Sequence, residues 1–251
     1  VGRVGDDVFG PQMRATLEKD GIDTTFVLET DDTPTGVALI VVDDQGQNSI
    51  VVAPGANGRV TAVDVEAAAE AIAAADVMLL QLEIPLEAVL RAAKLAAEHS
   101  VKVILNPAPA APLAQELLAL VDMLIPNETE TETLSSMPIG SAAELKAAAD
   151  HLLRQGVGAV ILTLGERGAL LVDEQRKIEL PAFWVEDVVD TTAAGDAFVG
   201  GLAVAIGEGL SPSEAIPWGA AAGALAVTRA GAQPSLPTRA EMLNFLSAGY
   251  R

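Results

Sequence analysis

Short apolar runs alternate with amphipathic helical segments through the middle of this chain, and this alternation constrains the fold more than any other feature. The runs are too short for helices and are apolar throughout, which is typical of parallel strands covered on both faces. The runs lie at residues 77–82, 101–105, 123–125 and 159–164, and the helical segments between them at 86–99, 113–120 and 141–155. The alternation predicts repeated β-α-β units, that is, a three-layer α/β/α fold with a mostly parallel sheet.

Two β-hairpins are predicted in addition to these units. Their strands lie at residues 36–42 with 49–53, and at 169–172 with 177–180. The first hairpin does not fit the α/β pattern, and we expect it to form a small sheet that covers the functional site. Further helical patterns occur at residues 64–75, 192–207, 211–228 and 239–246.

The charge and composition exclude several classes of function. Fifteen Lys and Arg stand against 35 Asp and Glu, a net charge of −20, which argues against binding nucleic acid or an anionic membrane. The absence of cysteine excludes disulfides, a thiolate nucleophile and a Cys-ligated zinc site. The two histidines, His99 and His151, lie in charge-flanked helical patterns. No signal peptide or membrane-spanning stretch is recognisable, so we expect a soluble cytoplasmic protein.

Ligands of open parallel sheets bind beyond the carboxyl ends of the strands. The residues that follow the predicted strands are therefore the candidates for a site. They are Glu83, Asn106, the segment 127–130 and the segment 165–168.

The most informative segment runs from Asp190 to Gly201, with the sequence DTTAAGDAFVGG. Small residues at 193–195 leave backbone N–H groups open at the start of a helix, which is a favourable place for an anion. Asp196 lies in the first turn, where a carboxylate could take a proton from an attacking hydroxyl. The residues alone leave a second interpretation open, in which this is a small-residue loop and Asp196 only begins a helix.

This segment is similar to the C-terminal signature of the ribokinase-like carbohydrate kinases, the PfkB family. Other segments resemble the same family, and the resemblance extends over essentially the whole chain. They are GDDVFG at residues 5–10, LQLE at 80–83, LNPAP at 105–109, PNETE at 126–130 and AVTRAGAQPS at 226–235.

The resemblance implies roles for individual residues. Asp196 corresponds to the catalytic base, and Ala193, Ala194 and Gly195 to the anion hole for the transferring phosphate. Asn127 and Glu130 correspond to a motif that governs Mg²⁺ and phosphate binding. The turn that binds the nucleotide corresponds to Thr163, Leu164, Gly165, Arg167 and Gly168. Without the resemblance, a G-x-x-G turn after a strand is a weak signal, and the chain has no Walker motif.

The resemblance also implies sugar and cation sites. Glu83 corresponds to a glutamate that contacts ribose, and Asp196 contacts the same sugar. A loop that binds K⁺ through one carboxylate and mostly backbone carbonyls corresponds to Asp190, Thr192, Ala226, Arg229, Gly231 and Ser235. The hairpin at about 35–53 corresponds to a lid that pairs with the lid of a second subunit, which predicts a homodimer.

The sequence departs from the family in two ways. Ala220 stands where an Asn or His is usual near adenine, which is expected to loosen nucleotide specificity. Nothing matches the family's first strand, its sugar-binding Asp or its Gly-Gly-x-x-x-Asn motif. We therefore expect residues 1–251 to be a single kinase domain that lacks the N-terminal part.

The expected function is ATP-dependent phosphorylation of a sugar hydroxyl, with D-ribose giving D-ribose 5-phosphate, with Mg²⁺ and K⁺ as cofactors. Glu83 and the loop at 226–235 favour ribose over other sugars. The alternatives are a related kinase for fructose, a nucleoside or a keto-deoxy sugar acid, and a truncated nucleotide-binding protein without activity. A dinucleotide-dependent oxidoreductase is disfavoured, because no G-x-G-x-x-G follows an early strand.

Overall fold

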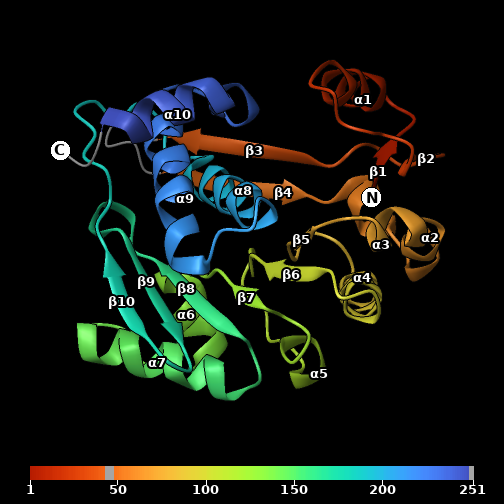
Figure 1. Cartoon of the computed structure of the whole chain (residues 1–251). Coiled ribbons are helices and arrows are strands. Elements are labelled where there is room, and N and C mark those ends of the chain that lie inside the picture. Colours follow the sequence, from red (N-terminus) through yellow and green to blue (C-terminus); the bar gives the residue numbers. More distant parts are fainter. Residues whose placement is uncertain (43–47, 249–251) are drawn as a thin grey trace. The chain divides into compact units, whose positions relative to one another are not determined.

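The computed structural model describes residues 1–42 and 48–248 (Figure 1). The described chain falls into two compact units. The first contains Val1–Val41 and Ser49–Val103, and the second contains Val42, Asn48 and the chain from Ile104 onward.

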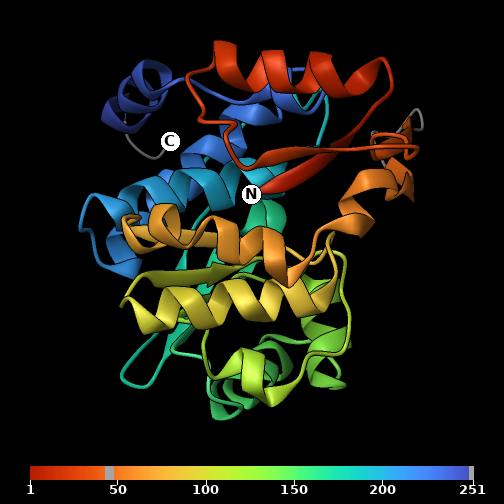
Figure 2. The same cartoon turned by 90° about the vertical axis from the view of Figure 1, so that its right-hand side faces the viewer.

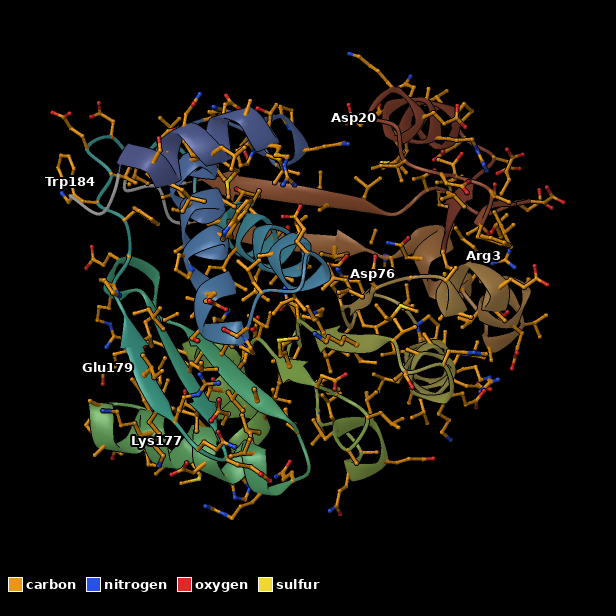
Figure 3. All side chains as sticks on the ribbon, in the orientation of Figure 1. Arg3, Asp20, Asp76, Lys177, Glu179 and Trp184 are labelled. Carbon is orange, nitrogen blue, oxygen red and sulfur yellow. The ribbon has the colours of Figure 1, made fainter. Side chains whose placement is uncertain are left out.

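The first unit opens with a parallel pair of short strands. β1 (Gly2–Gly5) pairs with β2 (Val27–Thr30), and α1 (Phe9–Lys19) connects them and packs along β1 (Figure 2). Arg3, labelled in Figure 3, donates two hydrogen bonds of 2.6 and 2.8 Å to the buried carboxylate of Asp64. A bidentate pair of this kind is a strong, geometrically specific contact, and it fixes β1 against the start of α2.

The remaining helices of the first unit are α2 (Ala62–Ala67), α3 (Ala69–Ala73) and α4 (Leu86–Glu98), with β5 (Val77–Leu80) between the last two. The helical pattern predicted at residues 64–75 corresponds to two short helices, α2 and α3. It is divided at Ala68, where the N–H bonds to Val65 three residues back and the turn tightens. Ala68 is fully buried, so this break lies inside the packing of α2 and α3 against α4.

The first predicted hairpin is confirmed in its strands. β3 (Val37–Val42) and β4 (Asn48–Ala53) form a separate two-stranded sheet, followed by the 3₁₀ turn η1 (Gly55–Arg59). The predicted connecting turn, residues 43–47, lies outside the described residues.

The main sheet has the strand order β10-β9-β8-β7-β6-β5. β6 (Lys102–Leu105), β7 (Met123–Leu124) and β8 (Ala159–Thr163) run parallel, whereas β9 (Ala169–Asp173) and β10 (Lys177–Leu180) are antiparallel. The predicted fold class, a ribokinase-like α/β fold with a mostly parallel sheet and small additional β-sheets, is confirmed. Because β8 and β9 are buried along almost their whole length, the apolar runs in the sequence reflect covering on both faces.

Helices cover both faces of this sheet in the second unit. α6 (Glu128–Ser135) and α7 (Ala142–Arg154) pack against β8, and α9 (Pro212–Ala226) packs against β9 and β10 from the other side (Figure 1). The edge strand β10 is tied to α7 by ion pairs of Lys177 with Asp150 and of Glu179 with Lys146, both β10 residues being labelled in Figure 3. The short helix α5 (Gln115–Leu118) precedes β7.

The last helices pack closely through small residues. A Cβ atom on Gly201 of α8 (Ala194–Gly207) would lie 2.8 Å from the Trp218 carbonyl oxygen, and one on Gly219 would lie 2.7 Å from the Phe198 carbonyl oxygen. Three short elements complete the second unit. The 3₁₀ turn η2 (Gly165–Arg167) lies between β8 and β9, and η3 (Gln233–Ser235) and α10 (Arg239–Ala248) follow α9. Among the described residues, no helix combines the length and apolar character that a membrane span requires.

Candidate active site

The start of α8 presents open backbone donors. The sequence predicts a helix from residue 192, but α8 begins at Ala194, because the N–H and hydroxyl of Thr192 are hydrogen-bonded to the Asp190 carboxylate. Ala193 is the N-cap, and its side chain cannot cap the helix. The Ala194 N–H bonds to Thr191 at 3.2 Å, whereas the next N–H groups lie in the first turn, where a helix offers no acceptor of its own. A Cβ on Gly195 would meet no atom within 4 Å, so there is free space beside the backbone of this turn.

Asp196 lies in the same turn. The residue is exposed by surface area, yet the protein atoms around its carboxyl group remove part of its hydration and raise its pKa. Within the described part of the chain, no hydrogen-bond donor is bound to this carboxylate. A carboxylate with a raised pKa and no partner, beside free N–H groups, can accept a proton from a hydroxyl group near an anion.

Asn127 and Glu130 form a capping box at the start of α6. The Glu130 N–H donates to Asn127 Oδ1 at 2.8 Å, and the Asn127 N–H donates to Glu130 Oε2 at 2.8 Å. The side-chain amide of Asn127 adds a bond of 3.0 Å to Oε1. Glu130 is buried, and burial raises the pKa of its carboxyl group in spite of the backbone hydrogen bond from Asn127. The motif therefore has a structural role, and it holds one desolvated carboxylate at the end of β7.

The predicted nucleotide turn follows β8 and lies beside this motif. Thr163 forms a parallel bridge with Asn127, and its N–H donates to the Pro126 carbonyl at 2.9 Å. Gly165 begins η2 with φ of +57°, and Gly168 ends it with φ of +94°. Arg167 reaches back to the first turn of α6 and pairs with Glu128 at 2.6 Å. The structure thus brings the 127–130 and 163–168 segments together.

Asp190 joins the two ends of the predicted cation loop. Its Oδ1 accepts hydrogen bonds from the N–H and hydroxyl of Thr192, at 2.9 and 2.6 Å, and its Oδ2 accepts one from the Gly231 N–H at 2.9 Å. These bonds, led by that from the Thr192 hydroxyl, lower the pKa of Asp190. The segment before Gly231 is also held by a bond of 2.8 Å from the Val189 N–H to the Val227 carbonyl.

The other predicted cation ligands can offer oxygen atoms. Arg229 pairs through its guanidinium with Glu241 at 2.5 Å, so its contribution would be its carbonyl. The buried Ser235 hydroxyl donates to the Ala232 carbonyl at 2.7 Å, which leaves its own lone pairs unused. The Ala226 carbonyl accepts from the Arg229 N–H at 3.1 Å. Oxygen ligands of this kind suit a hard alkali cation.

No group of three or more acidic or histidine side chains in the described residues could enclose a metal ion. A single buried carboxylate, Glu130, fits a Mg²⁺ ion that keeps its waters and is held mainly by nucleotide phosphates. Glu83 is exposed after β5 in the first unit, whereas the other candidates belong to the second.

Residues 1–239 match the sequence profile of the pfkB family carbohydrate kinases. The chain belongs to this family. It is 42% identical over 246 residues to the ribokinase of Haemophilus influenzae, an alignment that covers 98% of this chain and 80% of that one. It is 37% identical over 246 residues to the deoxyribokinase of Salmonella typhi, with the same coverage.

A solved member of the family has the same fold. The structure of Arabidopsis thaliana ribokinase complexed with ribose and ATP matches with a TM-score of 0.92 at 35% identity, covering 98% of this chain and 80% of that one. The family and the class of enzyme predicted from the sequence, a ribokinase-type phosphotransferase acting on carbohydrates, are confirmed. Relatives of this kind are longer than the present chain, which spans about four fifths of them.

Two site features were not predicted. The Glu128–Arg167 pair joins segments 39 residues apart, and no local pattern indicates it. Thr35, which binds the Asp7 carboxylate, was also missed, although GDDVFG at 5–10 was recognised as family-like. Both are long-range contacts, and only the folded chain reveals them.

Proposed function

We propose that this carbohydrate kinase transfers the γ-phosphoryl group of ATP to the primary hydroxyl of D-ribose and releases D-ribose 5-phosphate and ADP. The observation that carries the proposal is the start of α8. N–H groups without a side-chain cap share one turn there with the Asp196 carboxylate, which is partly desolvated and has no hydrogen-bond donor among the described residues. The ribokinase of Haemophilus influenzae, and that of Arabidopsis thaliana, which was solved with ribose and ATP, support the choice of substrates.

In this mechanism Asp196 accepts the proton of the sugar hydroxyl while its oxygen attacks the γ-phosphorus in line. The bond from the γ-phosphorus to the bridging oxygen breaks, and ADP carries that oxygen away. The segment Ala193–Gly195, where α8 begins, would supply the N–H groups that stabilise the charge on the transferring group; the Ala194 N–H would have to leave the Thr191 carbonyl, to which it is bonded in this structure. Because positioning dominates phosphoryl transfer, small displacements of this turn should lower the rate strongly.

The 127–130 and 163–168 segments would hold the nucleotide. Gly165 and Gly168 let the backbone of the turn approach it closely, with Thr163, Leu164 and Arg167 alongside. Asn127 and Glu130 would orient the water ligands of Mg²⁺, an ion that neutralises phosphate charge when it is bound. Arg167, whose partner Glu128 is half exposed, would be free to shift toward a phosphate.

The loop formed by Asp190, Thr192, Ala226, Arg229, Gly231 and Ser235 would hold K⁺. Its role would be to order the segment that leads into α8, since Asp190 and Thr192 directly precede the anion hole. Ala220 is half-buried against an apolar cluster with Phe183 and Met242 and has no hydrogen-bonding side chain, so discrimination between nucleotide bases should be weak.

Glu83 would accept hydrogen bonds from the sugar hydroxyls. A second candidate substrate is deoxyribose, since the deoxyribokinase of Salmonella typhi is 37% identical. The sugars differ in one hydroxyl group, and a site that hydrogen-bonds this group would reject the analogue that lacks it.

A panel of acceptors tests the proposal. ADP release would be measured with D-ribose, deoxyribose, fructose and adenosine in the full-length protein. We expect the highest kcat/KM with D-ribose; turnover no better than with fructose or adenosine would overturn the assignment, and a preference for deoxyribose would select the second candidate.

We also propose that the enzyme is a homodimer paired through the β3–β4 hairpins. The supporting observation is an exposed apolar face: Val37, Leu39 and Val41 alternate along β3, with exposed fractions of 39%, 67% and 68%. Alternate residues of a strand share one face, so these side chains form a continuous apolar stripe. Analytical ultracentrifugation of the wild type and of Leu39→Asp tests this, and a monomeric wild type would contradict it.

A further inference from the structure

The carboxylate of Asp7 joins two parts of the first unit that are far apart in sequence. Its Oδ1 accepts hydrogen bonds from the Phe9 and Gly10 N–H groups at the start of α1, at 3.2 and 3.1 Å. Across 28 residues, the Thr35 hydroxyl donates to the same oxygen at 2.6 Å, and the Thr35 N–H donates to Oδ2 at 3.0 Å. Four donors thus converge on one side chain.

Thr35 extends this contact to β1. The residue is 5% exposed, and its hydroxyl oxygen accepts a hydrogen bond of 3.0 Å from the Gly5 N–H. The backbone approach is close, because a Cβ on Gly5 would lie 2.2 Å from the Thr33 carbonyl oxygen and one on Gly10 would lie 2.1 Å from the Gly5 carbonyl oxygen. Only glycine fits at these two positions, so the end of β1 and the segment before β3 are held together without room for adjustment.

The two legs of the hairpin are also pinned to each other. The Ala56 N–H, after β4, donates to the Pro34 carbonyl, before β3, at 2.9 Å. A Cβ on Gly55 would lie 2.3 Å from that carbonyl oxygen, and one on Gly36 would lie 2.8 Å from the Pro54 carbonyl oxygen. A contact that fixes Thr35 therefore fixes the base of the whole hairpin.

We propose that Asp7 and Thr35 are positioning residues that hold the base of the β3–β4 hairpin in place, and so control how well the hairpin binds the sugar. This rests on the proposed function and on the expectation from the sequence that the hairpin covers the functional site. Asp7 is not a catalytic residue in this account, since both its oxygens are occupied by protein donors. Its effect on the reaction passes through Thr35.

The chain contains a matched control. Asp23 Oδ1 accepts hydrogen bonds from the Thr25 N–H and hydroxyl, at 2.8 and 2.6 Å, in an exposed turn. The two residues make the same kind of pair as Asp7 and Thr35, but they are neighbours in sequence and do not contact the legs of the hairpin. Asp23→Asn and Thr25→Val therefore weaken or remove a Thr-to-Asp side-chain hydrogen bond of the same kind without releasing the hairpin.

The test measures hydrogen exchange of the β3 and β4 amides together with KM for D-ribose and for ATP, in the full-length protein. Thr35→Val and Asp7→Asn should each speed exchange in both strands and raise KM for ribose by roughly tenfold or more, because each removes at least one hydrogen bond at the base of the hairpin, with KM for ATP unchanged. Thr35→Ser keeps the hydroxyl and should restore both values. If Thr35→Val does not fold, the smaller Thr35→Ala serves in its place.

Each other outcome counts against the proposal. Unchanged hydrogen exchange in β3 and β4, or equally faster exchange in Asp23→Asn, would show that Asp7 and Thr35 do not hold the base of the hairpin. Faster exchange with equal increases in both KM values, or no rescue by Thr35→Ser, would overturn the positioning role. If no sugar is phosphorylated at all, the proposed function fails, and the exchange measurement still decides whether Asp7 and Thr35 hold the hairpin.

Discussion

The carboxylate of Asp190 accepts a hydrogen bond of 2.9 Å from the backbone N–H of Gly231, which lies 41 residues further along the chain. The same carboxylate binds the N–H and hydroxyl of Thr192, just before the uncapped start of α8. One side chain therefore connects the loop after α9 with the segment that leads to Asp196. An ion bound in this loop would be coupled to the turn that contains Asp196.

The first prediction concerns this coupling. In the wild type, kcat/KM for ribose should be higher in KCl than in NaCl, and Asp190→Ala should lower kcat on the order of tenfold to a hundredfold, because the turn before α8 loses its anchor. The variant should also lose most of its preference for K⁺. Initial rates in the two salts at equal ionic strength check this, and a wild type that is indifferent to the cation would refute the role of the loop.

The nucleotide turn makes a prediction about stability. Gly168→Ala should destabilise the protein by about 3 kcal/mol or more, because φ is +94° and the new Cβ would lie 2.0 Å from the Leu180 carbonyl oxygen. Gly165→Ala, also at positive φ but with no atom within 4 Å of its Cβ, should cost only about 1 kcal/mol. Urea unfolding of both variants measures the difference, and equal losses would contradict the steric argument.

Two substitutions of Glu130 distinguish its role in capping α6 from its proposed role in binding Mg²⁺. Glu130→Gln keeps an oxygen for the Asn127 N–H but removes the charge and the acceptor of the Asn127 side-chain amide, so it should weaken the dependence of the rate on Mg²⁺ with only a small loss of melting temperature. Glu130→Ala removes the acceptor as well and should cost about 1 kcal/mol. Magnesium titrations and calorimetry on both variants provide the data. A Glu130→Gln enzyme with a normal magnesium titration would restrict Glu130 to capping.

The raised pKa of Asp196 predicts how stability depends on pH. The folded protein binds a proton on the Asp196 carboxyl group more tightly than the unfolded chain does. Protonation of Asp196 therefore stabilises the fold fully below the unfolded pKa near 3.8, and this contribution is lost as the pH rises through the folded pKa. Asp196→Asn should therefore raise the melting temperature at pH 7, by an amount that shrinks toward pH 4. For contrast, hydrogen bonds from Thr25 lower the pKa of Asp23, so Asp23→Asn should lower the melting temperature at pH 7. A loss of stability in Asp196→Asn at pH 7 would contradict this account.

Much of the second unit could be predicted from the sequence, since its signals are local. The apolar run of β8, the polar turn between β9 and β10, and the small residues before Asp196 each lie within a few adjacent positions. The N-terminal 30 residues were harder. α1 and β2 were not predicted, because Phe9 and Met13 of this helix remain exposed, which weakens its amphipathic pattern. It is held instead by Asp7 and by packing on β1.

Contacts between distant residues account for what the sequence could not provide. Asp7 with Thr35, Asp190 with Gly231 and Arg167 with Glu128 are separated by 28, 41 and 39 residues. The chemistry of each partner is ordinary, and an Asp beside a Gly or Thr has many local uses. Only the fold determines which of these groups meet, so the sequence indicated the candidate residues and the structure supplied their connections.

The central claim is that Asp196 is the base of a sugar kinase, and turnover of Asp196→Asn tests it most directly. The substitution keeps the size of the side chain and removes its ability to accept the proton. We predict that kcat with D-ribose falls by about 10² to 10⁴-fold, the usual contribution of a general base, while ATP binding measured by calorimetry stays the same. Near-normal turnover by Asp196→Asn would contradict the account.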